Sequence, residues 1–246
     1  MKIYFLMIDE PMYSPTSCRI FLERYREKVI GVSFPPGILN RKRIISTMGI
    51  YGLPSFLNIG MHHLLWKIKG GCIVRMFQQY GIRVYPVKDI NNPSFINLIK
   101  DLGVDLIISF NCPQVFRREL INTPKKGCIN IHFGMLPKYR GIQPIMHAIL
   151  NGEKEFGVTV HYIDEKLDSG DIILQENIPI TERDTLDTLY PKAFEVSGHL
   201  LVRAVDMIER GLVKHIYNDP NEKSYFSYPD RKTIRRYRNI CRIRQR

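Results

Sequence analysis

Short apolar runs alternate with amphipathic segments through the first 132 residues, and this alternation constrains the fold more than any other feature of the sequence. A short, largely apolar run between breakers is typical of a strand buried on both faces of a sheet. Such strands are expected over Ile3–Ile8, Val29–Phe34, Ile82–Val87, Val104–Phe110 and Cys128–His132. Helical spacing separates them over 17–28, 62–80, 93–101 and 113–120. Strands that alternate with helices predict an α/β fold with a mostly parallel sheet flanked by helices.

The pattern changes after residue 150. Strands with period-two alternation are expected over Val158–Tyr162 and Ile172–Ile180. A long amphipathic helix then opens at 181–185 and ends at Gly211, and Pro191 inside it predicts either a kink or a later start. Residues 35–60 contain breakers and predict no clear element. We expect a catalytic domain over 1–213 and a short helical basic C-terminal extension over 214–246.

The charge of the chain is concentrated in that extension. The 36 Lys and Arg against 24 Asp and Glu give a net charge of +12. Residues 214–246 hold ten Lys and Arg against three acids, a net +7. Three interpretations stay open: a solvated helix face, an element that binds pyrophosphate or supports a homodimer, or a contact with nucleic acid or an anionic membrane.

Several classes of protein are excluded. No run approaches the 18 apolar residues of a membrane span, and the first apolar run is too short for a secretory signal. The five cysteines form no C-x-x-C pair, so a disulfide framework or a zinc site is not expected. No G-x-G-x-x-G motif marks a dinucleotide site. We expect a cytoplasmic protein that needs no metal.

Polar residues that could carry chemistry follow the strand Cys128–His132. Asn130 and His132 are two apart, so both side chains face the same side of that strand. Ligand sites of open parallel sheets form at the carboxyl ends of the strands. Asp168 lies farther along, in a turn-rich segment. An imidazole that accepts a proton, an amide that donates to an oxyanion and a carboxylate that orients the imidazole would suit acyl transfer.

Structural alternatives for these residues stay open on spacing alone. His132 could be a structural histidine at a strand end, and Asp168 could be a turn residue. The segment Leu136–Gly141 could be only a loop.

Together these residues resemble a known family. Asn130, His132, the loop Leu136–Gly141, and Asp168 with Gly170 are similar to the motifs of the folate-dependent formyltransferases, which act on methionyl-tRNA, glycinamide ribonucleotide or amino sugars. The resemblance covers about residues 82–210. It implies a Rossmann-like sheet and formyl transfer from 10-formyltetrahydrofolate to an amine. It also implies that Asn130, His132 and Asp168 are the catalytic residues, with Asp168 acting directly or by holding a water.

The resemblance further implies where the substrates bind. One wall of the folate slot would be formed by Cys112, Val115 and Phe116, and the other by Ile163, Asp164 and Leu167. Val115 and Phe116 could equally be helix core. Tyr139, Arg140 and His161 are candidates for contact with the acceptor, although His161 could equally be structural.

Departures from the family pattern narrow the acceptor. The loop after the first strand has no glycine, which argues against a phosphate cradle for glycinamide ribonucleotide. About 35 residues follow the last long helix, too few for the C-terminal barrel of methionyl-tRNA formyltransferases. We therefore expect a small-molecule acceptor, the amine of a nucleotide-linked amino sugar, as in polysaccharide biosynthesis. The alternatives are a methionyl-tRNA formyltransferase-like enzyme without the barrel, and a non-catalytic RNA-binding relative.

Overall fold

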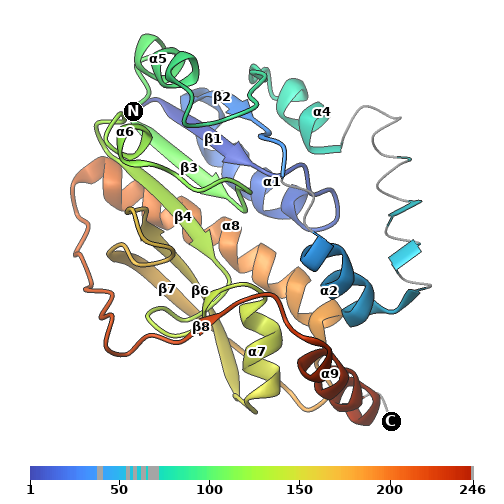
Figure 1. The fold of residues 1–246 in the computed structure, drawn as a ribbon. Coiled ribbons are helices and arrows are strands. Elements are labelled where there is room, and N and C mark those ends of the chain that lie inside the picture. The colour runs from blue at the N-terminus through green and yellow to red at the C-terminus, as the bar shows by residue number, and fades with distance from the viewer. Residues whose placement is uncertain (38–40, 54–55, 58–59, 62–64, 66–71, 245–246) are drawn as a thin grey trace.

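A six-stranded sheet with helices on both faces forms the centre of the computed structural model, which describes residues 1–37, 41–53, 56–57, 60–61, 65 and 72–244 (Figure 1). The strand order is β2-β1-β3-β4-β6-β7. The strands β1 (Ile3–Met7), β2 (Val29–Ser33), β3 (Leu106–Phe110) and β4 (Cys128–His132) are parallel to their neighbours. The strands β6 (Glu155–Tyr162) and β7 (Ile172–Pro179) complete the sheet in antiparallel orientation. The predicted α/β class with a mostly parallel sheet is confirmed.

Side chains of the parallel strands alternate between two apolar clusters. Ile3, Phe5, Leu106 and Ile108 face the larger cluster, whereas Tyr4, Leu6 and Ile107 face the smaller one. The larger cluster lies under α1 (Ser14–Tyr25), α4 (Cys72–Gln79) and α8 (Leu186–Arg210), and the smaller under α5 (Pro93–Asp101) and α6 (Arg118–Ile121). Strands covered on both faces have the continuous apolar runs by which they were predicted.

The long helix α8 lies across the back of the sheet and packs along α1 (Figure 1). Gly198 allows the close approach, because a Cβ there would come within 3.0 Å of Ser17 and Ile20. Thr185 caps the helix at its start, and Gly211 ends it in the left-handed conformation. The helix includes Pro191, so its start is not delayed beyond that residue as one prediction allowed.

Two other predicted elements are corrected. Residues 82–87 do not form a strand: Val84 makes a single bridge to Val32, and Pro86, which has no N–H, cannot extend the ladder. Residues 113–117 are irregular, and the predicted helix begins only at Arg118. Side chains hold this irregular segment: Gln114 bonds to the backbone of Ile90 and Lys88, and Asn91 bonds to that of Val115 and Arg117.

Other boundaries agree more closely. The helix Pro93–Asp101 has its predicted bounds and is capped by Asn92. The helix expected over 17–28 begins earlier, at Ser14, and its last residues form the 3-10 turn η1 (Arg26–Lys28). The helix expected over 62–80 is present over Cys72–Gln79, and its first part, except Leu65, lies outside the described residues. The stretch 35–60, for which the sequence predicts no clear element, contains the helix α2 (Arg41–Tyr51).

The C-terminal segment folds back onto the body of the protein. Its strand β8 (Tyr225–Phe226) pairs with β5 (Arg140–Gly141) in a second, two-stranded sheet. Its helix α9 (Arg231–Arg244) packs against α2 and α7 (Pro144–Leu150), and the Tyr237 hydroxyl accepts a hydrogen bond from the Leu186 amide. No helix among the described residues is long and apolar enough to cross a membrane.

Candidate active site

The carboxyl end of β4 carries His132, whose two ring nitrogens have different surroundings. Its Nε2 lies 2.7 Å from the carbonyl oxygen of Tyr139. A carbonyl only accepts, so Nε2 carries the proton and neutral His132 has a bare Nδ1. That Nδ1 lies 3.7 Å from Oδ2 of Asp168. The bare Nδ1 can therefore accept a proton, and the imidazolium that results faces a carboxylate.

Asn130 is held beside His132 with its amide orientation defined by two partners. The Ser109 hydroxyl, on the adjacent strand β3, donates to Asn130 Oδ1 at 2.9 Å. On the other side, Nδ1 of His161 donates to the Tyr162 carbonyl, so its Nε2 accepts from Asn130 Nδ2 at 3.2 Å. One hydrogen of Asn130 Nδ2 remains for an oxygen in front of the strand.

Asp168 reaches this group from the loop between β6 and β7. Its Oδ2 accepts a hydrogen bond from the Gly141 amide at 2.9 Å, and its Oδ1 lies 3.8 Å from His161 Nε2. The carboxylate is almost buried, with 9% of its side chain exposed. The structure thus brings together the three residues that the sequence predicts to be catalytic.

The backbone around these residues is unusual. Tyr139, Gln143, Asp168 and Asn111 have positive φ angles between 50° and 60°, a region that non-glycine residues rarely adopt. Such conformations concentrate where the surrounding structure over-determines them, commonly at functional sites. At two glycines of the motifs there is no room for any side chain. A Cβ at Gly141 would lie 2.2 Å from the Phe226 carbonyl oxygen, and one at Gly170 would lie 2.1 Å from that of Tyr162.

The C-terminal segment holds both loops of the site. Ser224 accepts a bond from the Tyr139 amide through its hydroxyl and one from the Arg140 amide through its carbonyl. Asn218, which is 2% exposed, donates through Nδ2 to the carbonyls of Asp168 and Gly170 and accepts from Arg140 through Oδ1. Asn218 therefore links Arg140 to the turn that carries Asp168, and the Asp168 carboxylate in turn accepts from the Gly141 amide.

The predicted folate residues lie on two neighbouring segments. Cys112 and Ile163, one from each segment, contact the same small apolar cluster, and an ion pair between Arg118 and Glu165 joins the segments farther out. Val115 and Leu167 are exposed, at 69% and 52%.

The other two predicted folate residues have structural contacts. Phe116 is buried in the small apolar cluster. Asp164 accepts bonds from the Lys166 amide and the Ser169 hydroxyl within its own turn.

The residues predicted to contact an acceptor have protein partners here. The Tyr139 hydroxyl donates to Glu153, and the Tyr139 ring stacks on Phe226. Arg140 is buried and bonds Asn218, and His161 orients Asn130. Direct contact of these three with an acceptor stays a prediction.

Ser109, Asn218 and Ser224 are the positioning residues that sequence reasoning missed. Ser109 is the polar residue in the otherwise apolar run Leu106–Phe110, a signal that could have found it. Asn218 and Ser224 lie in a polar segment where nothing local distinguishes them.

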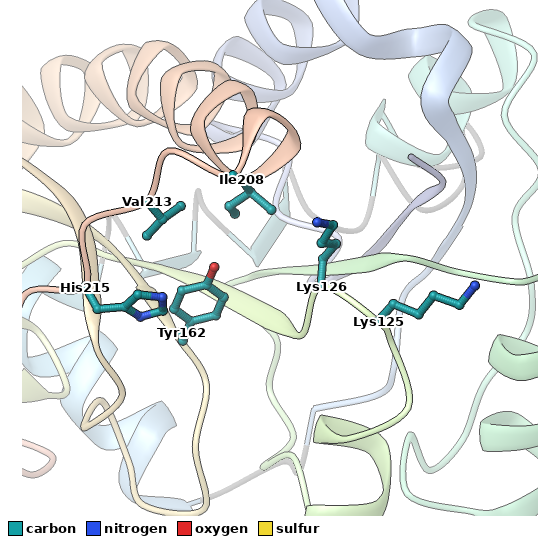
Figure 2. Close-up of a pocket in the computed structure, with 7 residues that line it drawn as sticks. Lys125, Lys126, Tyr162, Ile208, Val213 and His215 are labelled. Atoms are coloured by element: carbon teal, nitrogen blue, oxygen red, sulfur yellow. The ribbon is translucent and has the colours of Figure 1, made fainter.

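A separate open pocket of about 340 Å³ lies on the α8 side of the sheet. Tyr162 and His215 stack in it with ring centroids 5.3 Å apart, and Figure 2 shows Lys126 directed toward Ile208 while Lys125 points away. Tyr162 follows His161 in β6, so its side chain lies on the opposite face of the sheet from His161. Among the residues the structure describes, no cluster of three or more His, Cys, Asp or Glu could hold a metal ion.

Solved structures of other proteins share this α/β fold. Glycinamide ribonucleotide transformylase 1 from Symbiobacterium toebii has the same fold, with a TM-score of 0.64, 19% identity, and coverage of 86% of this chain and 89% of that one. The formyltransferase PseJ from Anoxybacillus kamchatkensis, solved with UDP-4,6-dideoxy-4-formamido-L-AltNAc and tetrahydrofolate, has a TM-score of 0.53 and 27% identity. That match covers 65% of this chain and 82% of PseJ.

Sequence comparison gives the family. The formyl transferase family model matches residues 68–205, so the chain belongs to the formyl transferase family. Methionyl-tRNA formyltransferase from Halothermothrix orenii is 36% identical over 166 residues, which cover 68% of this chain and 52% of that protein. The chain spans about half the length of the curated relatives it matches.

Replacing Asn218 tests its role in the site. Asn218→Ala removes two donated bonds from a buried position, and we expect the free energy of unfolding to fall by about 1–3 kcal/mol. Asp168 loses its support at the same time, so the catalytic turnover proposed below should fall by more than the fraction of unfolded protein explains. Urea denaturation and turnover of the same preparation measure the two effects.

Asn221→Ala is the matched control, because Asn221 is exposed in the same segment. Its unfolding free energy should stay within about 0.5 kcal/mol of the wild type. Equal unfolding free energies and equal turnover of the two variants would show that Asn218 does not support the site.

Two buried histidines predict a pH dependence of stability. Burial lowers the pKa of His161 to about 4, against the opposing effect of the Asp168 carboxylate, and burial also lowers the pKa of His147 to about 4. Below pH ~6.5 the unfolded chain takes up protons that the folded chain does not. The free energy of unfolding should therefore fall as the pH decreases from ~6.5 toward 4, by about 1–3 kcal/mol per histidine.

Urea denaturation at pH 7 and pH 5 measures this loss. Both pH values lie above the range in which carboxylates ordinarily titrate, so the histidines dominate the difference. His147→Phe keeps a ring in the stack with Phe226 and should remove the share of His147 from the pH dependence. An unchanged pH dependence in this variant would contradict the assignment.

Proposed function

We propose that this protein transfers a formyl group from 10-formyltetrahydrofolate to the amine of a nucleotide-linked amino sugar. The observation that carries the proposal is the bare Nδ1 of His132, facing Asp168 and flanked by the amide of Asn130. This arrangement offers a proton acceptor, an oxyanion donor and a carboxylate around one small space. Acyl transfer to an amine needs these three groups.

The folate supplies an activated formyl group when it is bound. The two segments 112–116 and 163–168 fit such a group, because each exposes one apolar side chain, Val115 and Leu167, that can cover a flat ring. Main-chain groups of both segments would bind the pterin edge. The formyl carbon would then lie in front of Asn130 and His132, at the carboxyl end of β4.

The protein's own residues account for each proton. The amine nitrogen bonds to the formyl carbon and gives its proton to His132 Nδ1. Asn130 Nδ2 donates to the formyl oxygen as that oxygen gains charge, an effect worth about 10² to 10³ in rate at comparable sites. His132 Nδ1 would then return its proton to the folate nitrogen as the bond between that nitrogen and the formyl carbon breaks. Asp168 stabilises the imidazolium between these two transfers.

The start of α1 supports the choice of acceptor. The backbone amides there are not free to bind a phosphate, because the Glu10 carboxylate already accepts bonds from the amides of Met12, Tyr13 and Ser14 at 2.7–3.0 Å. A carboxylate in this position repels a phosphate that would use the same amides. This argues against glycinamide ribonucleotide as acceptor. Similarity to PseJ, which was solved with a UDP-linked formamido sugar, supports an amino sugar.

A second candidate acceptor is an aminoacyl-tRNA. It is favoured by the 36% identity to methionyl-tRNA formyltransferases, which exceeds the identity to PseJ. The chemistry at His132 would be the same for either acceptor.

Turnover with a panel of acceptors tests the proposal. Purified protein with 10-formyltetrahydrofolate should release tetrahydrofolate with at least one UDP- or dTDP-linked amino sugar, and not with glycinamide ribonucleotide. His132→Ala should reduce kcat by about 10² to 10⁴, the usual contribution of a general base. His199→Ala, an exposed histidine of α8, is the control and should retain full turnover.

Each result of this assay has a definite meaning. Release with charged initiator tRNA alone would replace the sugar by the tRNA as acceptor and leave the chemistry standing. Near-normal turnover by His132→Ala would reject the mechanism. Absence of release with every acceptor would reject the proposed function.

A further inference from the structure

Large apolar side chains are exposed along α2 and the segment that follows it. They are between 37% and 60% exposed: Ile44, Ile45, Met48, Leu53, Leu57, Met61 and Leu65. Single exposed apolar residues are ordinary on protein surfaces, whereas a contiguous group marks a site of interaction.

The same part of the chain lacks carboxylates. No Asp or Glu occurs between Glu27 and Asp89, whereas nine Lys and Arg do. The helix α9 also has no acidic residue and has seven Lys and Arg. Figure 1 shows α2 and α9 at the same end of the molecule, and they are in contact, since a Cβ on Gly49 of α2 would meet Ile234 of α9 at 2.8 Å.

The helix α9 directs four of its arginines outward, whereas Arg236 and Arg244 bond to carbonyls of the body of the protein. Ile234 and Tyr237 are buried against the body of the protein. Arg231, Arg235, Arg238 and Arg242 recur at steps of four, three and four residues, so they form one stripe, and all four are exposed. Ile243, beside this stripe, is 72% exposed. We call the exposed apolar residues of 44–65 and the exposed face of α9 the basic-apolar surface.

Charge and polarity together identify what this surface fits. A second copy of the chain in a two-fold dimer would place the arginine stripe of α9 against itself, cation against cation. An RNA would satisfy the arginines but leave the leucines, isoleucines and methionines without a partner, since RNA is contacted through stacking rings and hydrogen bonds. An anionic lipid bilayer satisfies both, with phosphates for the arginines and acyl chains for the apolar side chains.

We propose that the basic-apolar surface binds the surface of an anionic phospholipid bilayer. The protein would lie on one leaflet, with the seven exposed apolar side chains named above at the level of the headgroups and the exposed α9 arginines against lipid phosphates. This proposal does not depend on the reaction proposed above.

Vesicle binding tests it directly. We use vesicles of 70% phosphatidylcholine and 30% phosphatidylglycerol and vesicles of phosphatidylcholine alone, with co-sedimentation as the readout. Trp66 is the one tryptophan of the chain and lies beside Leu65 in the sequence, so its fluorescence gives a second readout. We expect binding to the anionic vesicles with a blue shift of the fluorescence, and about tenfold weaker binding to neutral vesicles or in high salt.

Matched substitutions separate this surface from the rest of the protein. Leu57→Glu adds an acid at a side chain that is 60% exposed, and Leu212→Glu does the same at one that is 59% exposed on another surface. Arg235→Glu with Arg238→Glu reverses two charges on α9, and Lys125→Glu with Lys126→Glu reverses two exposed lysines elsewhere. Leu57→Glu and the double arginine variant should each weaken vesicle binding by about tenfold or more. The controls, Leu212→Glu and the double lysine variant, should each weaken it by less than about twofold.

Three results would overturn the proposal. The first is no binding to anionic vesicles, and the second is equal loss in the test and control variants. The third is binding of bulk tRNA, measured in parallel, that depends on the α9 arginines but not on Leu57 while vesicles are not bound, which would assign the surface to RNA.

Discussion

The hydrogen bond from His132 Nε2 to the Tyr139 carbonyl is the interaction on which the site depends. It selects the tautomer, so the nitrogen that faces Asp168 is free to accept a proton. Tyr139 can present its carbonyl in this direction because it has a φ of 60°. That conformation is held in turn by Ser224, which binds the Tyr139 amide, and by the ring of Phe226. Residues near the C-terminus thus define which ring nitrogen of His132 is bare.

This dependence explains why the C-terminal segment is part of the site although it carries none of the three catalytic candidates. Asn218 supports the turn of Asp168, and Phe226 lies so close to Gly141 that a side chain there would collide with it. The amide of Gly141 then binds the Asp168 carboxylate. A loop after β4, a loop after β6 and the returning segment therefore fix one another. The exposed arginine stripe of α9 is separate from this role, because Arg231, Arg235, Arg238 and Arg242 lie on the outer face of the helix.

Sequence reasoning succeeded where the determining signal is local. The strand Cys128–His132 and the helix Pro93–Asp101 have their predicted bounds, because a buried strand reads as an apolar run and Asn92 caps the helix through its own side chain. Linked motifs predicted Asn130, His132 and Asp168, which the structure brings together, and their catalytic role stays a prediction. The helix expected over 113–120 begins only at Arg118, because Gln114 and Asn91 bind backbone groups distant in the chain. Asn218 and the pairing of β5 with β8 join residues far apart in the chain, which no local pattern reports.

The measurement that tests the central claim most directly is the tautomer of His132. Long-range ¹H–¹⁵N NMR correlations of the histidine ring nitrogens, assigned with His132→Gln, distinguish a protonated from a bare nitrogen above the range of imidazole titration. The account predicts a proton on Nε2 and a bare Nδ1. Ser224→Ala weakens the support of the Tyr139 loop and should increase exchange between the tautomers. A proton on Nδ1 in the wild type would contradict the account, since the nitrogen facing Asp168 could then not accept a proton from the amine.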